Sequence, residues 1–380
     1  SLVRDEIKIE SQQAKAWIVD RPGEPRVGII QLPSFYQSEG VSATSDVSAL
    51  LGKLVEAGVA GLILDLRLNG GGSLEEAIKL TGLFFDYGPV VQTKDAEGRV
   101  QVSRDPDPLT RYDGPLVVLT SRLSASASEI LAGAIQDYGR GVVVGDPATF
   151  GKGTVQSMIQ LGSLMPPDAA EQVANPGALK LTIRKFYRPS GSSTQLKGVE
   201  PDIVLPTPTG VMKVGESELP AALPWDEVPV TRYRRLDRVT PHLAVLREKS
   251  AARVASDEEF VWLREDMQRL ESQRDNPVVS LNEAERRREK ADREARRQAR
   301  QSARAKRAGS AETKYEITLK NLATPGLPEP LTAALTNATV AAVVGKDVLA
   351  GEDKSADVDV TLEEARRILS DYIAALAAAP

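Results

Sequence analysis

The sequence predicts an α/β core of layered strands and helices, followed by a helix-rich C-terminal region. Two observations support this fold class. Apolar β-type runs alternate with helical patterns through residues 27–206, as expected when helices connect partly parallel strands. Beyond a proline-rich stretch at 206–229, the chain becomes charged and helical over 240–307. We therefore expect one domain at 27–206 and a second, mostly helical, at 207–380.

The predicted elements of the first domain follow one another in a regular order. Strands are predicted at residues 27–32, 62–66, 115–120, 141–145, 154–159 and 179–187. Helices are predicted at residues 46–57, 74–85 and 126–138. In the second domain we expect a strand at 315–319 and an amphipathic helix at 362–376, capped by Thr361 with Glu364 three residues on.

Composition excludes several kinds of site. The 380 residues contain no cysteine, which rules out a disulfide framework, a thiol nucleophile and a thiolate metal site. The single histidine, His242, argues against a zinc site, so neither a metal nor a cofactor is expected. The net charge of −5 gives no overall bias toward nucleic acids, and no apolar run is long enough to cross a bilayer.

Ser126 is the first candidate for catalysis, because it lies where the strand at 115–120 gives way to the helix at 126–138. A hydroxyl at a helix N-terminus feels the positive end of the helix dipole, and the free N–H groups of the first turn can stabilise an oxyanion. Serine is also favoured there as a simple helix cap, and for this segment alone capping is the better interpretation. Ser124 and Ser128 lie beside it and leave the identity of a nucleophile open.

Lys152 changes this weighing, because a serine nucleophile needs a base and histidine is almost absent. A lysine can act as a base if burial lowers its pKa. Side chains alternate along a strand, so Lys152, Thr154 and Gln156 share one face, and Gln156 is placed to hydrogen-bond Lys152. The alternative is an exposed lysine in a turn. Five residues separate Gly145 from Gly151, and this spacing excludes a phosphate-binding loop.

A glycine-rich loop at 70–72 follows the strand predicted at 62–66 and precedes the next helix. Glycines permit positive φ and let a ligand approach backbone N–H groups closely, so this loop can donate one hydrogen bond of an oxyanion hole. A tight strand-to-helix turn would use glycine for the same conformational reason. We expect Asp65 and Arg67, just before the loop, to be structural partners.

Three segments in this order resemble the carboxyl-terminal processing peptidases, the S41 serine–lysine proteases, and among them the tail-specific protease branch. The segments are Asp65–Gly72, Ser124–Glu129 and Thr149–Gln156. The resemblance is strong over 27–206 and weaker beyond, where Leu223–Asp226 also resembles that branch. It implies a ClpP/crotonase-like layered core of strands and helices.

The resemblance also implies a role for each candidate residue. Ser126 would be the nucleophile, Lys152 the general base and Gln156 the residue that orients the lysine. It implies an oxyanion hole formed by backbone N–H groups, those of Ala127 and of Gly71 or Gly72. The other serines and Glu129 would be structural.

A substrate class and a location follow from the resemblance as expectations. The expected activity is that of a serine endopeptidase, which forms an acyl-enzyme with proteins that have exposed, apolar, unstructured C-terminal tails. The expected location is the periplasm, and the expected partner is an adaptor lipoprotein. The branch carries a PDZ domain before the core, and residues 1–26 would be the remnant of its exit and a linker. The alternative is a protease-fold protein that binds peptides or an adaptor with little turnover, because the PDZ domain is absent.

A basic run at 285–307 holds eleven Lys or Arg residues and four acidic ones. Charge pairs at Glu289–Arg293 and Asp292–Arg296 have the i,i+4 spacing of an exposed helix, and only alanines interrupt the polar residues. We therefore expect a solvated helix here and no nucleic-acid partner. An RNA- or lipid-binding arm is the alternative.

Overall fold

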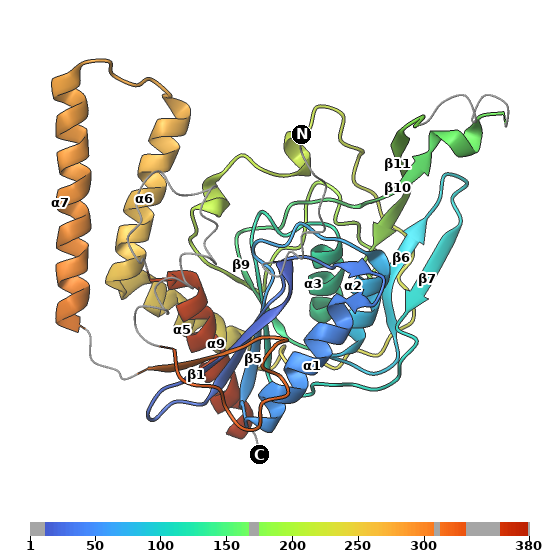
Figure 1. Ribbon diagram of the computed structural model, residues 1–380, viewed down its shortest axis with the longest axis horizontal. Helices are drawn as coiled ribbons and strands as arrows, with labels where there is room; N and C mark the ends of the chain where they lie inside the picture. Colours follow the sequence, from blue (N-terminus) through green and yellow to red (C-terminus); the bar gives the residue numbers. More distant parts are fainter. Residues whose placement is uncertain (1–11, 167–174, 308–311, 332–357, 379–380) are drawn as a thin grey trace, which may run out of the picture.

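A seven-stranded sheet forms the centre of the computed structural model, which describes residues 12–166, 175–307, 312–331 and 358–378 (Figure 1). Its strands, in spatial order, are β12 (Ile203–Val204), β9 (Val142–Gly145), β8 (Leu116–Thr120), β5 (Gly61–Asp65), β2 (Val27–Gln31), β1 (Lys15–Asp20) and β13 (Thr313–Ile317). The first five run parallel, and β1 is antiparallel to both of its neighbours.

Helices cover both faces of this sheet, which is why its strands are almost continuously apolar. On one face lie α1 (Ala43–Glu56), α2 (Leu74–Gly82) and α3 (Ala127–Asp137), which share one buried apolar cluster with the sheet. On the other face lie α5 (Leu243–Ser256) and α9 (Val360–Ala377), which share a second cluster with it (Figure 1). The predicted α/β core is confirmed.

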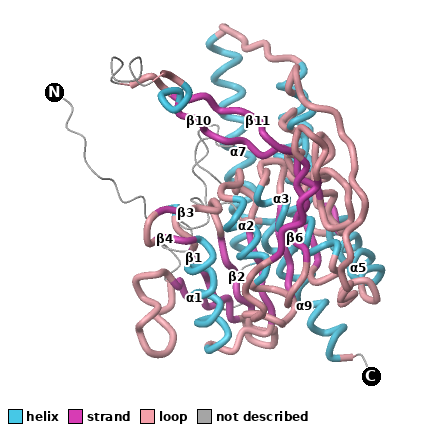
Figure 2. Tube along the Cα trace, turned by 90° about the vertical axis from the view of Figure 1, so that its right-hand side faces the viewer, coloured by secondary structure: helices cyan, strands magenta, loops and turns pink. Residues whose placement is uncertain are grey.

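A second, four-stranded antiparallel sheet lies beside the first. Its order is β10 (Thr154–Gln160), β11 (Ala178–Tyr187), β6 (Pro89–Lys94) and β7 (Val100–Arg104). The hairpin of β10 and β11 projects from the body of the protein (Figures 1 and 2). The remaining short elements are β3 (Gln37–Ser38), β4 (Val41–Ser42), η2 (Leu161–Leu164), η3 (Thr209–Val211) and η4 (Glu216–Glu218).

Two long helices, α6 (Glu258–Asp275) and α7 (Glu283–Arg307), form an arm at the side of the molecule opposite the hairpin (Figure 1). The predicted basic helix is confirmed in α7, which buries no residue. Its predicted charge pairs are wrong, because Glu289 pairs with Arg286, and Asp292 and Arg296 form no ion pair among the described residues. The helix instead places three arginines at 5.1 to 5.6 Å from the ring centre of Trp262 on α6.

Several boundaries differ from the prediction for identifiable reasons. The last helix begins at Val360, two residues before the predicted start at 362, because the side chain of Asp359, and not that of Thr361, accepts the hydrogen bond of the capping position. The strands β1, β6, β7 and β12 were not predicted. Residues 1–11 of the expected linker and residues 332–357 of the expected second domain lie outside the described residues. The division at 1–26, 27–206 and 207–380 stays a prediction.

Strands from both ends of the chain complete the main sheet. β1 lies within the expected linker and pairs with β2, and β13 lies within the expected second domain and pairs with β1. The C-terminal region is therefore joined to the core by a shared sheet as well as by α9. None of the described helices is long and apolar enough to span a membrane.

Candidate active site

The three sequence motifs meet at one edge of the main sheet. The parallel strands β5, β8 and β9 end at this edge, and the segments that follow them carry the glycine loop, Ser126 and Lys152, respectively. Crevices outside the carboxyl ends of parallel strands are the usual ligand sites of α/β sheets. The topology therefore brings together the three motifs that the sequence separates.

Ser126 occupies a strained backbone conformation at the start of α3. Its φ of 58° and ψ of −110° are rare for a residue with a side chain, and such strain gathers at functional sites. The residue is partly exposed, while Ala127 behind it is buried. Among the described residues, the Ala127 N–H has no backbone or side-chain acceptor, so it is free to bind an oxyanion.

Glu129 joins the serine segment to the lysine segment. Its buried carboxylate accepts four hydrogen bonds, from Ser126 N at 2.7 Å, Thr149 Oγ1 at 2.6 Å, Gly151 N at 2.7 Å and Lys152 N at 3.0 Å. One oxygen, Oε2, holds the backbone of both Ser126 and Lys152. Burial raises the pKa of Glu129 to about 7, against the effect of these hydrogen bonds.

Sequence reasoning gave Glu129 only a structural role. The capping-box spacing, in which a glutamate follows a serine by three residues, is the signal for its contact with the Ser126 N–H. Its contacts with the lysine segment lie 20 to 23 residues further along the chain, and no local pattern announces them.

Lys152 is half-buried in a clamped turn. Thr194 Oγ1 donates a hydrogen bond to the Lys152 carbonyl at 2.9 Å from the side opposite Glu129. Burial lowers the pKa of Lys152, and the nearby charge of Lys180 lowers it further, while the carboxylates of Glu216 and Glu129 oppose this shift. The Lys152 ammonium forms no hydrogen bond or ion pair with any described residue, so no direct contact in this part of the chain stabilises its charged form.

Gln156 does not take the position predicted for it. Lys152 lies before β10, which begins at Thr154, so the strand alternation on which the prediction rested does not extend to the lysine. The Gln156 side chain is exposed and forms no hydrogen bond with Lys152 in the structure. The predicted contact is therefore wrong for this conformation of the side chain.

The glycine loop lies directly against the serine segment. A Cβ added to Gly71 would lie 2.9 Å from the Ser126 Cβ, so only glycine fits here at the observed φ of 106°. The Gly71 N–H donates to Asn69 Oδ1 at 2.9 Å, whereas the Gly72 N–H has no acceptor among the described residues. Of the two candidates, Gly72 is therefore the one with a free donor.

The hydroxyls of Ser124 and Ser128 are not free, because both donate hydrogen bonds to the backbone that leads into the glycine loop. Ser124 Oγ donates to the Leu66 carbonyl at 2.8 Å, and Ser128 Oγ donates to the Asn69 carbonyl at 2.8 Å. Both serines are fully buried.

The described residues contain no group of three or more His, Asp or Glu side chains arranged to hold a metal ion.

These features define a class of protein that has a layered α/β fold, a strained serine at the start of a helix, and a half-buried lysine whose backbone is joined to that of the serine through Glu129. Comparison with known proteins gives the family. The family described as "Peptidase family S41" matches residues 26–205, and "C-terminal domain of tail specific protease" matches residues 211–374. The chain belongs to peptidase family S41.

Two sequence relatives agree with this assignment. The "Tail-specific protease" of Haemophilus influenzae is 42% identical over 83% of this chain and 44% of its own length. The "Carboxy-terminal-processing protease" of Bartonella bacilliformis is 34% identical over 57% of this chain and 47% of its own length. A solved structure, "Photosystem II D1 C-terminal processing protease", is 32% identical over 48% of this chain and 44% of that one, with a TM-score of 0.41. The chain thus spans less than half the length of these relatives.

Proposed function

We propose that this chain is a serine endopeptidase that cleaves through an acyl-enzyme on Ser126, with Lys152 as the general base. The observation that carries the proposal is the single carboxylate oxygen of Glu129, which holds the backbone of both residues at the carboxyl edge of the sheet. Family membership supports the reaction class.

The proposed reaction uses neutral Lys152, which its lowered pKa makes available. Lys152 Nζ takes the proton of Ser126 Oγ as this oxygen attacks the peptide carbonyl. The N–H groups of Ala127 and Gly72 stabilise the oxyanion, and the lysine ammonium then protonates the leaving amine. Lys152 next takes a proton from a water molecule as the water oxygen attacks the ester carbonyl, and it returns this proton to Ser126 Oγ as the ester bond breaks.

Gln156 completes the proposed set as the residue that orients Lys152. It lies four positions beyond the lysine at the start of β10, and its exposed side chain needs a change of rotamer to reach the lysine. Gly71 would serve the oxyanion hole by its close approach to Ser126, and its own N–H stays with Asn69.

We further propose that the substrates are proteins with unstructured, apolar C-terminal tails. The relatives named tail-specific and carboxy-terminal-processing proteases support this substrate class. The periplasmic location and the adaptor lipoprotein stay predictions that rest on the resemblance alone.

Two alanine variants test the proposal on an unfolded protein substrate that ends in an apolar tail. Ser126→Ala and Lys152→Ala should each abolish cleavage, measured by gel and by mass spectrometry of the products. Ser45→Ala on α1 and Lys290→Ala on α7 replace exposed residues of the same types and should cleave like the unchanged chain. Full cleavage by either active-site variant would contradict the assignment.

The alternative function is a protein that binds peptides or an adaptor with little turnover. It predicts that the unchanged chain and Ser126→Ala bind the same tail peptide equally well and that neither cleaves it. Binding measured by fluorescence anisotropy, beside the cleavage assay, separates the two functions.

A further inference from the structure

We propose that Asp359, at the N-terminus of α9 in the C-terminal region, is a positioning residue for the active-site loop at residues 66–72. It would act by holding Arg67, whose backbone belongs to that loop. The inference rests on the proposed function in one respect only, which is the use of this loop in catalysis.

The side chain of Arg67 is gripped from two sides. Asp65 accepts from Arg67 Nε at 3.0 Å and from Nη2 at 2.7 Å. Asp359 accepts from Nη1 at 2.8 Å and from Nη2 at 2.7 Å, and Thr361 Oγ1 accepts from Nη1 at 2.8 Å. Asp359 and Arg67 are 292 residues apart, yet the guanidinium uses its planar fork on carboxylates from both ends of the chain.

This contact is buried, which makes it matter for the conformation of the loop. The side chains of Arg67, Asp65 and Asp359 are 14%, 4% and 8% exposed. Burial alone would raise the pKa of Asp359, but the charge of Arg67 and its hydrogen bonds outweigh burial and lower it. Asp359 is therefore charged, and removing its charge leaves the largely buried guanidinium with one carboxylate partner instead of two.

The Arg67 backbone leads directly to the serine segment. Ser121 Oγ donates to the Arg67 carbonyl, and Leu123 N donates to Ser121 Oγ at 3.0 Å. Two residues further, the Asn69 carbonyl accepts from Ala125 N at 3.1 Å, next to Ser126. A shift of Arg67 would therefore displace both the free Gly72 N–H and the strained turn that carries the nucleophile.

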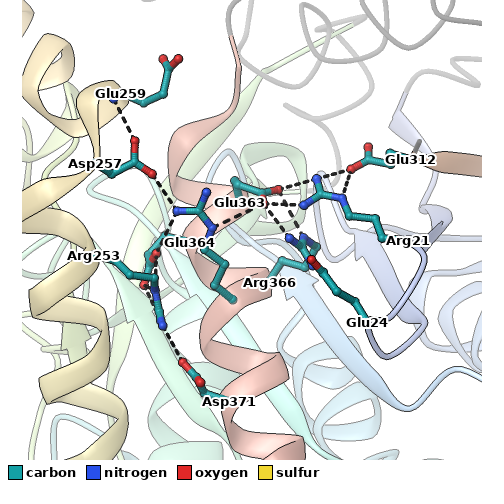
Figure 3. Close-up of polar contacts among 11 residues, drawn as sticks. Arg21, Glu24, Arg253, Asp257, Glu259, Glu312, Glu363, Glu364, Arg366 and Asp371 are labelled. Atoms are coloured by element: carbon teal, nitrogen blue, oxygen red, sulfur yellow. Dashed lines mark hydrogen bonds and ion pairs between the residues drawn. The ribbon is translucent and has the colours of Figure 1, made fainter. Parts of the chain in front are cut away.

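The docking of α9 does not depend on Asp359 alone. Figure 3 shows a separate set of ion pairs on the same helix, in which Glu363 binds Arg21 and Arg366. In the same view, Glu364 binds Arg253 of α5. These contacts join α9 to the start of the chain and to α5, and none of them reaches residues 66–72. They supply a matched control for the effect of Asp359.

The test compares Asp359→Asn with Glu363→Gln, since each removes one carboxylate at the N-terminal end of α9, the first at the capping position and the second in the first turn. Asp359→Asn should lower kcat roughly 100-fold with KM unchanged, because a small displacement of catalytic groups has an effect of that size. Glu363→Gln should keep kcat. Thr361→Val removes one hydrogen-bond acceptor of Arg67 and no charge, so it should lower kcat less than Asp359→Asn does. If Asp359→Asn fails to fold, Thr361→Val still tests the proposal. Equal losses of kcat in the Asp359 and Glu363 variants, or full kcat in the Asp359 variant, would overturn the proposal.

Amide hydrogen exchange gives a second readout that does not depend on activity. Asp359→Asn should speed exchange in residues 66–72 and 121–128, and Glu363→Gln should not. A chain that never cleaves a substrate contradicts the proposed function alone, because exchange still reports whether Asp359 holds the loop. Unchanged exchange in these segments would overturn the positioning role.

Discussion

The two sides of the candidate site are built differently. The serine side, residues 121–129, is mostly buried and is fixed by side-chain hydrogen bonds to the segment that carries the glycine loop, so that its strained turn has little freedom. The lysine side, residues 149–156, is held by the Thr149 side chain and by the backbone of Gly151 and Lys152, and it leads into a hairpin that projects from the body. The Lys152 ammonium and the Gln156 amide have no partners among the described residues.

The difference separates two tasks of a serine–lysine site. The nucleophile and the oxyanion donors must be in place before the substrate arrives, because preorganised dipoles are the largest source of electrostatic stabilisation. The base must be neutral, and a lysine without a carboxylate partner in a half-buried setting meets this need. The predictions below test this division, from the largest expected effect to the smallest.

Removing the base should have the largest effect. Lys152→Ala should lower kcat/KM by at least about 10³-fold, because the removal of one member of a catalytic unit costs about as much as the removal of the whole unit. Thermal unfolding should change little, since the ammonium makes no contact that stabilises the fold. If Lys152→Ala loses stability along with activity, this contradicts the view that the lysine side chain makes no contact that stabilises the fold.

Breaking the joint between the two sides should have the next largest effect. Glu129→Gln replaces one acceptor oxygen with a donor that faces other donors, and kcat should fall roughly 100-fold. Steady-state kinetics on a peptide with an apolar tail measures it. Thr81→Val, which removes a buried hydroxyl bonded only to the carbonyl of Ala77 within α2, is the control and should keep kcat.

Activity should rise with pH for two reasons that act in the same direction. Neutral Lys152 is the base, so the rate rises as the lysine loses its proton, at a pH lower than for an ordinary lysine. Glu129, with a pKa of about 7, gains a proton below that pH and loses part of its hold on both segments. A pH profile of kcat/KM should therefore fall on the acidic side, and a profile that falls as pH rises above 7 would contradict both assignments.

Stability should respond to the serine side and not to the hairpin. Ser128→Ala leaves the buried Asn69 carbonyl with one hydrogen bond fewer and should lower the free energy of unfolding by about 1 kcal/mol. Leu181→Ser on β11 changes a side chain that is 40% exposed and should stay within about 0.5 kcal/mol. Urea unfolding measures both, and a larger loss for Leu181→Ser would show that the hairpin is packed in solution.

The smallest expected effect is a change in the pKa of Lys152, the proposed base. Lys180 on β11 helps to lower the pKa of Lys152, so Lys180→Ala should move the lysine limb of the pH profile to higher pH with the same maximal rate. Lys197→Ala, which removes a cation stacked at 3.8 Å on the ring of Trp225, should leave the limb in place. A limb that does not move in Lys180→Ala would mean that burial alone sets the pKa.

The sequence predicted those parts of the fold and site that local patterns encode. The strand–turn–helix pattern around Ser126 and the glycines at 70–72 are short motifs, and the alternation of apolar runs predicted the central strands. Long-range contacts could not be read in this way. The pairing of Arg67 with Asp359 joins residues 292 apart, and the Gln156 prediction failed because Lys152 lies outside the strand that carries Gln156.

The central claim is that Ser126 forms an acyl-enzyme, and intact-protein mass spectrometry tests it most directly. The chain is mixed with a peptide ester, quenched in acid during turnover, and digested to locate the added acyl group. We expect an adduct on Ser126 that builds up within the first turnover and is absent from Ser126→Ala and Lys152→Ala. Cleavage that continues without an adduct, or an adduct on Ser124 or Ser128, would contradict the proposal.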